Sequence, residues 1–388
     1  MKIAVIGAKG LPPKQGGIEH YCAEVYPRMV SQGHSVDLFA RATYTHQPWF
    51  YQHHFQGVRV ITLPAVGWRG LDAFTSSGLG VVYAHQYDVI HFHALGPALF
   101  SFFPRLYSSA KVVATCHGLD WQRAKWGYSS KRFLRWSEQV AVRYTHQLTV
   151  VSEDLQAYFW QTYRRQTCYI PNAPARYTQS GSNFFYGHSL GLQPHQYLLF
   201  LGRLVPEKCP DLLIKAFQRI QPQGWKLVLV GDHSDTSSFV TQLHKLSLNN
   251  SHIIFAGELL GSRLAEIVRG AGLFILPSRV EGLPLAMLEA MQEGIPVVAS
   301  DIPAHQQLIG NQRGLLFPSG SVESCSSAIA WALENPLSMT AMARHAQKHI
   351  DQYYSWDRIV QQTLQIYTAE DILTESEPLV TNSKSSGF

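Results

Sequence analysis

The sequence of 388 residues has few cysteines, and their spacing builds neither a cross-linked nor a metal-bound core. Five occur, an odd number with no Cys-x-x-Cys pair: Cys22, Cys116, Cys168, Cys209 and Cys325. This pattern argues against a disulfide framework and against a structural zinc site. We expect most of these side chains to be small buried hydrophobic groups in a reducing compartment.

Long apolar runs are also missing. No segment approaches the roughly 18 apolar residues that a membrane-spanning helix needs. The first residues, MKIAVIGAKG, are typical of a strand and turn, not of a basic leader with an apolar core and a cleavage site. We therefore expect a cytoplasmic protein.

Charged residues are scarce at 15%, whereas hydrophobic residues make up 46%, a balance typical of a folded chain. The charge is unevenly spread: residues 1–180 contain 18 Lys plus Arg and 9 Asp plus Glu, and the remainder contains 14 and 18. The halves therefore carry +9 and −4, which sum to the net +5. The basic half fits contact with an anionic membrane face or a pyrophosphate-linked acceptor, and solvated surface charge is an equally open interpretation.

The chain does contain an alternation of strands and helices that occurs twice. In the first half, apolar runs suited to buried parallel strands alternate with helical stretches such as residues 18–31 and 131–145. These runs are KIAVIG, SVDLFA, VRVITLP, YDVIHFHA, KVVATCHG and QLTVVS. After a polar stretch at residues 174–194 the pattern restarts, with YLLFLGRL, KLVLVGD, HIIFAGEL, LFILPS, PVVAS and GLLF. This predicts an α/β fold of two doubly wound, Rossmann-like domains.

We expect the first domain at residues 1–180 and the second at residues 190–352, with the hinge in the polar stretch between them. Residues 353–372 predict a final helix that returns to the first domain, and residues 374–388 a disordered tail. Two such domains would face each other across a cleft lined by the carboxyl ends of their strands, where ligands of open parallel sheets bind. Motifs at strand ends therefore carry the functional prediction.

The segment LFILPSRVEGLPLAMLEAMQEGIPVVASD follows this rule most clearly. Pro284 suits the first position of a helix, and the open amides beside it with the helix dipole predict an anion site for a nucleoside diphosphate. Those amides belong to Gly282, Leu283, Leu285 and Ala286. Glu281 would lie near the sugar or phosphate end of the ligand, and Glu289 in the second turn would accept the ribose hydroxyls. The alternative is an acidic loop residue and an ordinary helix-face glutamate.

Arg203 and Lys208 follow the first strand of the second domain, in LGRLVPEK. Two cations beside a diphosphate neutralise its charge and stabilise it as a leaving group. No divalent metal or other cofactor is then required, and no Asp-x-Asp metal signature is present. The alternative is a loop salt bridge between these cations and Glu207.

The loop GAKGLPPKQGGIEHY after the first strand lacks the Gly-x-Gly-x-x-Gly spacing, and the second strand ends in Arg41, not in an acidic ribose ligand. This argues against an NAD site. Gly16 and Gly17 instead permit close approach of the backbone to a phosphate or sugar. Glu19 and His20 would face the cleft on the acceptor side, or act as ordinary cap residues.

His117 ends another strand of the first domain, in KVVATCHG, where it would contact a donor-sugar hydroxyl or position the acceptor. The loop after it is suited to stacking on a sugar and pairing with phosphate, through Asp120, Trp121, Arg123 and Lys125. His91 and His93, in YDVIHFHA, are expected to be packed or capping residues. We assign catalytic roles to His117, Arg203, Lys208 and Glu281, and no nucleic-acid partner is expected.

The run EGLPLAMLEAM, with PVVASD and GLLF after it, resembles the carboxyl-terminal domain of family 4 retaining glycosyltransferases, which have the two-domain GT-B fold. The resemblance covers nearly the whole chain. In that family a Gly-Arg-x₄-Lys pattern holds the diphosphate, matched here by Arg203 and Lys208, and a glycine pair contacts it from the first domain. The family's nucleobase loop corresponds to Glu258 and Leu259. Many members have glycine at the position of Pro284, so one backbone donor cannot exist here.

The motifs GAKGLPPKQGGIEHY and HGLDWQRAKW more specifically resemble a bacterial subgroup that includes β-1,4-rhamnosyltransferases of capsule and exopolysaccharide assembly. That resemblance implies a deoxythymidine-diphosphate sugar and a lipid-pyrophosphate-linked acceptor. The expected function is retaining transfer of a hexose or deoxyhexose from a nucleotide-sugar to a hydroxyl, by front-face displacement. The alternatives are a nucleotide-sugar epimerase on the same fold and a binding protein with a dead site.

Overall fold

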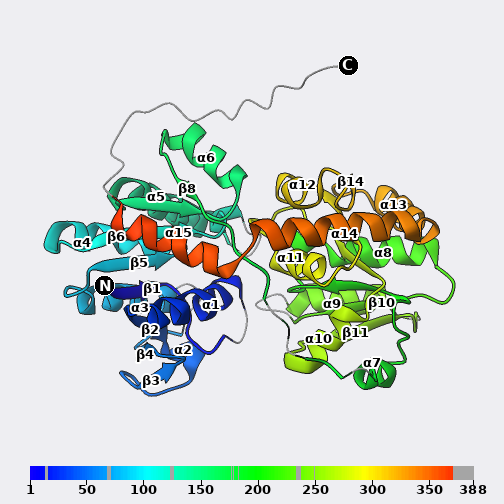
Figure 1. Cartoon of the computed structure of the whole chain (residues 1–388), viewed down its shortest axis with the longest axis horizontal. Coiled ribbons are helices and arrows are strands. Elements are labelled where there is room, and N and C mark those ends of the chain that lie inside the picture. The colour runs from blue at the N-terminus through cyan, green and yellow to red at the C-terminus, as the bar shows by residue number, and fades with distance from the viewer. Residues whose placement is uncertain are drawn as a thin grey trace.

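The protein is described by a computed structural model that covers residues 1–369 except 14–15, 68–70, 123–125, 176, 178, 182, 233–236 and 249. Its two lobes each contain a sheet flanked by helices (Figure 1). The predicted tail at residues 374–388 lies outside the described residues. Among those described, the helices are too short or too polar to cross a bilayer.

The described residues of the first lobe form an eight-stranded sheet in the order β3-β4-β2-β1-β5-β6-β7-β8. Neighbouring strands run parallel except β3 and β4, which form an antiparallel hairpin. The strands are β1 (Lys2–Ile6), β2 (Ser35–Arg41), β3 (Gln52–Phe55), β4 (Val58–Leu63), β5 (Val89–His93), β6 (Lys111–Cys116), β7 (Gln147–Val150) and β8 (Cys168–Tyr169). The central strands are buried because helices cover both faces, as expected for unbroken apolar runs.

The helices of the first lobe are α1 (Gly17–Ser31), α2 (Ala42–Thr45), α3 (Leu71–Tyr83), α4 (Phe102–Tyr107), α5 (Tyr128–Tyr144) and α6 (Glu153–Tyr163), with short 3₁₀ turns η1 (Pro97–Ser101) and η2 (Asp120–Gln122). Both helices predicted here are present, as α1 and α5. Right-handed crossovers place α1 on one face of the sheet and α3, α4 and α5 on the other.

The second lobe contains a six-stranded parallel sheet, within the described residues, in the order β11-β10-β9-β12-β13-β14. Its strands are β9 (Tyr197–Leu201), β10 (Lys226–Val230), β11 (Ile253–Gly257), β12 (Leu273–Leu276), β13 (Val297–Asp301) and β14 (Leu315–Pro318). Its helices are α7 (Phe185–Ser189), α8 (Pro210–Ile220), α9 (Ser237–Leu246), α10 (Gly261–Arg269), α11 (Leu285–Gln292), α12 (Pro303–Ile309), α13 (Val322–Glu334) and α14 (Pro336–Tyr353), with the 3₁₀ turn η3 (Pro206–Lys208). The predicted α/β architecture of two doubly wound domains is confirmed.

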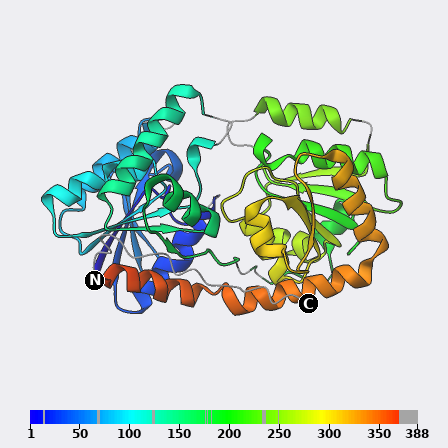
Figure 2. The ribbon, with the colours of Figure 1, turned by 90° about the horizontal axis from the view of Figure 1, so that it is seen from above.

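The end of the described chain crosses between the lobes. Helix α14 packs on α11 in the second lobe, and α15 (Trp356–Thr368) packs on α1 in the first. Buried polar contacts anchor α15: the Thr363 hydroxyl lies 3.3 Å from the Tyr21 hydroxyl, and the Tyr367 hydroxyl lies 2.6 Å from Nδ1 of His91. Figure 2 shows this orange-to-red run along one side of both lobes. The chain thus joins the two lobes at the 170–194 segment and again at α14–α15.

Candidate active site

A buried ion pair joins the loops that follow β9 and β12. Nζ of Lys208, in η3, lies 2.7 Å from Oε1 of Glu281, in the loop before α11. The same carboxylate oxygen accepts a hydrogen bond from the Ser278 hydroxyl at 2.7 Å. Side-chain exposure is 14% for Lys208 and 12% for Glu281. Within the described residues, Lys208 therefore forms its ion pair with Glu281. The alternative interpretation of the sequence was a salt bridge with Glu207.

The charge state of this pair follows from its surroundings. Burial raises the pKa of Glu281, but the Lys208 ammonium and its hydrogen bond outweigh burial and hold that pKa below its ordinary value. His305, fully buried in α12, has Nδ1 2.8 Å from the carbonyl oxygen of Ser300. Burial lowers the pKa of His305 to about 4. At neutral pH the pair is thus ionised, and His305 beside it is uncharged.

Arg203 lies on the same loop as Lys208, two residues beyond β9. Gly202, which lies between the end of β9 and Arg203, is close to Lys208, since a Cβ built on Gly202 would lie 3.1 Å from Cδ of Lys208. A Cβ at Gly231, after β10, would collide with the Gly202 carbonyl oxygen. The ends of β9 and β10 therefore pack backbone against backbone beside the two predicted cations.

Helix α11 begins one residue later than the sequence predicted. Pro284 is the N-cap, with φ −77° and ψ 95°, and Leu285 is the first helical residue. No side chain caps this helix start. The amides of Met287 and Leu288 bond to the carbonyl oxygen of Pro284, at 3.0 and 3.2 Å. The donors that remain for an anion are those of the turn before them, as at other uncapped helix starts.

Glu289, in the second turn of α11, is bonded to the segment that connects the lobes. The Tyr177 hydroxyl donates to Oε2 of Glu289 at 2.6 Å, and the backbone of Ala175 also bonds to this carboxylate. Burial raises the pKa of Glu289 to about 7, and these hydrogen bonds only partly oppose the rise. The predicted ribose contact would therefore share the carboxylate with Tyr177.

The two lobes come within contact distance at the start of α11. A Cβ at Gly282 would lie 2.5 Å from the carbonyl oxygen of His117, and a Cβ at Gly17 would lie 3.1 Å from Cδ1 of Leu285. Glycine is needed at position 282 because any larger residue would push the His117 loop away. The structure thus brings four predicted site residues of the two lobes together: Gly17, His117, Gly282 and Leu285.

Glu19 is placed differently from the acceptor contact expected of it. It is 2% exposed, and its Oε1 accepts a hydrogen bond from the amide of Lys9 at 2.9 Å. Gly16, the N-cap of α1, has φ 105°, and a Cβ there would collide with the Glu19 carboxylate. Glu19 therefore holds the loop that carries the glycine pair, and glycine at position 16 leaves room for it.

His117 lies at one end of a buried chain of polar side chains. Its Nε2 is 3.0 Å from Nδ1 of His93, whose Nε2 is 2.6 Å from the Tyr26 hydroxyl. The Tyr26 hydroxyl is also 3.1 Å from Nδ1 of His91. Burial lowers the pKa of His91 to about 3 and holds that of His93 well below its usual range. The predicted packing of His91 and His93 is confirmed, both are neutral, and His93 orients His117.

The remaining acceptor-side residues are dispersed. Nε1 of Trp121 donates to Oε2 of the fully buried Glu138 at 2.9 Å, and the Arg135 guanidinium lies 4.3 Å from the Trp121 ring centroid. This gives Trp121 a packing role, so its stacking on a sugar stays a prediction. Asp120 begins η2 and is partly exposed, and Arg123 lies outside the described residues.

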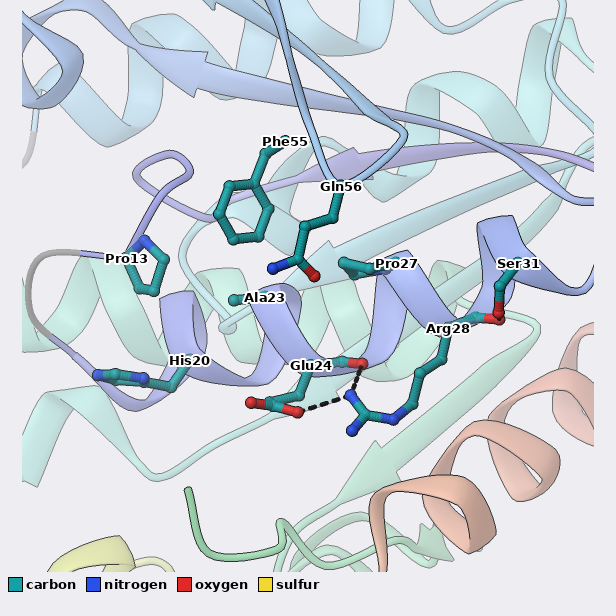
Figure 3. Close-up of a pocket in the computed structure, with 9 residues that line it drawn as sticks. All are labelled: Pro13, His20, Ala23, Glu24, Pro27, Arg28, Ser31, Phe55 and Gln56. Atoms are coloured by element: carbon teal, nitrogen blue, oxygen red, sulfur yellow. Dashed lines mark hydrogen bonds and ion pairs between the residues drawn. The ribbon is translucent and has the colours of Figure 1, made fainter. Parts of the chain in front are cut away.

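His20 lines a shallow cavity of about 560 Å³ between α1 and the β3–β4 hairpin, in which Glu24 and Arg28 form an ion pair at 2.6 Å (Figure 3). Burial lowers the pKa of His20. The nine lining residues all come from the first lobe: Pro13, His20, Ala23, Glu24, Pro27, Arg28, Ser31, Phe55 and Gln56. This cavity is therefore separate from the Lys208–Glu281 pair.

The predicted nucleobase loop follows β11 in the second lobe. Glu258 is exposed and Leu259 is 7% exposed, and the preceding Gly257 accepts a hydrogen bond from the amide of Gly231 at 2.8 Å. The loop thus lies beside the ends of β9 and β10. Its contact with a base, which would use backbone atoms, stays a prediction.

Sequence reasoning missed three residues that contact the predicted site: Ser278, Tyr177 and His305. Ser278 and His305 each follow a strand end of the second lobe, so the rule that selected Glu281 would have found them. Tyr177 lies in the polar connecting segment, and its contact with Glu289 spans 112 positions with no local signal.

Comparisons with known proteins identify both domains of the chain. Residues 16–173 match the model of the glycosyl transferase 4-like domain, and residues 190–349 match that of the glycosyl transferases group 1. The chain is similar to a D-inositol 3-phosphate glycosyltransferase of Gordonia bronchialis, with 26% identity over 91% of this chain and 84% of that protein.

Two solved structures have the same fold. Sucrose-phosphate synthase from Thermosynechococcus elongatus superposes with a TM-score of 0.80 at 22% identity, covering 94% of this chain and 98% of the other. HepE from Anabaena, in complex with UDP and glucose, gives a TM-score of 0.77 at 23% identity, with the same coverage.

Proposed function

The chain belongs to the glycosyltransferases of the GT-B type, with a family 4-like first domain and a group 1 second domain, and on this premise we propose a specific reaction for it. It transfers a hexose or deoxyhexose from a nucleoside-diphosphate sugar to a hydroxyl of a glycan or lipid-linked acceptor, with retention at the anomeric carbon. The observation that carries the proposal is the cluster of Lys208, Glu281 and the uncapped start of α11.

The diphosphate binds between Arg203, Lys208 and the backbone amides near Gly282. Lys208 has three donors, so it can hold a phosphate oxygen while it keeps its 2.7 Å contact with Glu281. Two cations and a helix start in a site closed to water stabilise the negative charge that develops on the departing diphosphate. Glu281 keeps Lys208 in place and lies near the donor sugar.

The bond from the anomeric carbon to the diphosphate oxygen breaks, and the acceptor hydroxyl oxygen bonds to the same face of that carbon. The hydroxyl proton passes to an oxygen of the departing diphosphate, so atoms and charge balance without a protein nucleophile. His117, held by His93 at 3.0 Å, contacts a hydroxyl of the donor sugar or of the acceptor. Closure of the lobes, which meet at Gly282 and His117, limits hydrolysis.

The proposed reaction uses no divalent metal, because Arg203 and Lys208 supply the positive charge. A transfer assay with and without EDTA tests this directly. Equal rates support metal independence, and loss of activity that Mg²⁺ or Mn²⁺ restores would refute it.

The subgroup resemblance of the first lobe favours a deoxyhexose linked to deoxythymidine diphosphate as donor and a lipid-pyrophosphate-linked glycan as acceptor. The place of such a reaction is polysaccharide biosynthesis at the inner face of the membrane, with the protein bound peripherally. The excess of basic residues in the first half supports an anionic acceptor of this kind.

A thermal-shift panel of nucleoside diphosphates and nucleotide-sugars is the first test. A ligand present at one hundred times its dissociation constant stabilises the folded protein by about 2.7 kcal/mol, so the preferred donor should raise the melting temperature clearly. Anomeric analysis of the transferred sugar by NMR then tests retention. A product of inverted configuration would refute the front-face displacement.

Two rival functions are separated by simple controls. An epimerase on this fold would turn over a nucleotide-sugar without any acceptor, whereas a transferase would show only slow hydrolysis. A binding protein with a dead site would keep its cellular function after replacement of Glu289 by alanine.

A further inference from the structure

The first lobe exposes large hydrophobic side chains on three consecutive helices. On α5, Tyr128 is 77% exposed and Trp136 is 52% exposed, and on α4, Leu106 is 65% exposed. Phe74, Phe103 and Phe133 of α3, α4 and α5 are each about two-fifths exposed. We call these six residues the aromatic face. Single exposed hydrophobic residues are ordinary, whereas a contiguous group marks an interaction site.

Ring contacts join the three helices of the aromatic face. The Phe74 and Phe133 ring centroids are 6.1 Å apart, and Phe133 and Trp136 are 5.9 Å apart. The nearly buried Phe100, in η1, lies between the helices, 4.9 Å from Phe74 and 6.3 Å from Phe103. Leu106 follows Phe103 by three positions on the same side of α4. Phe74, Phe103, Phe133 and Trp136 therefore form one surface with Phe100, and Tyr128 lies two turns before Trp136 on α5.

Basic residues border this surface. Helix α5 contains four of them, Lys131, Arg132, Arg135 and Arg143, against one acid, Glu138, which is buried. Arg132 follows Tyr128 by four positions and precedes Trp136 by four, so it lies between two exposed rings. Lys131 and Arg132 are in the first two turns of α5, where the helix dipole disfavours positive charge. Helix stability therefore does not account for them.

The aromatic face lies on the side of the first sheet away from α15 (Figure 2). Figure 2 shows the cyan helices α4 and α5 across the sheet from the red α15. Helices α3, η1–α4 and α5 follow β4, β5 and β6, so each begins at the sheet edge where His117 follows β6. Phe74 and Tyr128 lie in the first turn of their helices and Phe133 in the second turn, near that edge.

We infer that the aromatic face is a membrane-docking surface that binds the headgroup region of a bilayer containing anionic lipid. Rings and leucine enter the interface, and the α5 cations contact lipid phosphates, the division of chemistry typical of interfacial helices. Docked in this way, the protein holds the sheet edge that carries His117 near a lipid-linked acceptor in the same bilayer. This last step rests on the proposed function, whereas the docking itself does not.

Flotation with vesicles of phosphatidylcholine, with and without phosphatidylglycerol, tests the docking in the absence of any substrate. Full-length protein should float with the anionic vesicles and much less with the neutral ones, and salt should weaken the binding. The double variant K131E/R132E should bind anionic vesicles at least tenfold more weakly, because each Lys or Arg near such a surface contributes about a fivefold factor. F133S/W136S should lose at least tenfold on the same vesicles.

Matched controls come from the second lobe. R344E/K348E makes the same change in charge on exposed positions of α14, and L337S removes a leucine that is 86% exposed. Both should float like the unchanged protein. Circular dichroism and the melting-temperature shift with nucleoside diphosphate should be the same for all variants, which shows that they fold and bind donor.

The inference is overturned if the unchanged protein does not float with anionic vesicles, or if the two second-lobe controls lose as much binding as the α5 variants. It is also overturned if light scattering shows a dimer that F133S/W136S converts to a monomer without change in flotation, since a second copy would then be the occupant. A protein that floats as expected but transfers no sugar would refute the proposed function alone.

Discussion

Replacing Lys208 by methionine removes the ammonium that lies 2.7 Å from Oε1 of Glu281 and leaves that carboxylate buried beside the Ser278 hydroxyl. Removing one member of a buried ion pair costs about 3–5 kcal/mol of folding free energy. Both side chains retain some exposure, 14% and 12%, so we expect the lower end, about 3 kcal/mol at neutral pH. Glycosyl transfer should fall by about 100-fold or more, because one preorganised charge on the leaving diphosphate is lost.

The pH dependence of this variant has a definite sign. In the unchanged protein the pKa of Glu281 is held below its ordinary value, so the pair stabilises the fold above the unfolded pKa of about 4.3 and that contribution is lost as the pH falls through the lower folded pKa. Without Lys208, burial raises the pKa of Glu281. The carboxyl then takes up a proton at acidic pH and escapes the penalty. The difference in stability between the two proteins should therefore grow from acidic to neutral pH.

Melting curves across this pH range and a transfer assay measure both effects. The double variant Lys208→Met/Glu281→Gln is the matched control, since it removes both charges and should recover most of the lost stability but none of the activity. The reasoning is refuted if the double variant melts no higher than the single one, or if Lys208→Met keeps full transfer activity.

Three further predictions concern other parts of the site. Burial raises the pKa of Glu289 to about 7, so the protein should lose stability as the pH rises from about 4.3, the unfolded value, to about 7, and Glu289→Gln should abolish that slope in melting curves. Equal slopes would contradict it. Gly282→Ala should lower transfer by about 100-fold because its Cβ would force the lobes apart, whereas Gly67→Ala, where a Cβ meets nothing within 4 Å, should be neutral in the same assay. Trp121→Phe should lower the free energy of unfolding by about 1–3 kcal/mol, because buried Glu138 loses the 2.9 Å hydrogen bond from Trp121. If Trp121 has only a packing role, the KM for the acceptor should not change.

The sequence was sufficient for the architecture because burial makes parallel strands nearly pure apolar runs. The six runs of the second half correspond to β9–β14 in order. The strands it missed are β3, with the sequence QHHF, and the two-residue β8. Both lie at the edges of the first sheet, where one side is unpaired and polar residues are tolerated. β3 pairs with the adjacent β4 in a hairpin, and its polar sequence hides it, whereas β8 is very short and pairs with β7, from which α6 separates it in the chain.

The candidate site was partly predictable for a related reason. In parallel sheets the carboxyl ends of all strands meet at one edge, so Arg203, Lys208, Glu281 and His117 could be grouped from the positions of the strands alone. The contact partner of each of these residues could not be predicted in the same way. Lys208 and Glu281 are 73 positions apart in the sequence. Glu207, directly beside Lys208, carries the same negative charge as Glu281 and was also a plausible partner. Only the folded loops decide which of the two glutamates pairs with Lys208.

The bonds within the site also indicate where donor affinity arises. Glu281 already accepts hydrogen bonds from Lys208 and Ser278, and Glu289 accepts one from Tyr177. A sugar or ribose hydroxyl that shares these carboxylates exchanges a hydrogen bond to water for one to the protein, and such an exchange adds little net free energy. The diphosphate differs, because its charge meets cations and open amides whose attraction is largest in a site shielded from water. Most of the binding free energy should therefore reside in the diphosphate, so a nucleoside diphosphate should bind nearly as tightly as its nucleotide-sugar and a nucleoside monophosphate far more weakly.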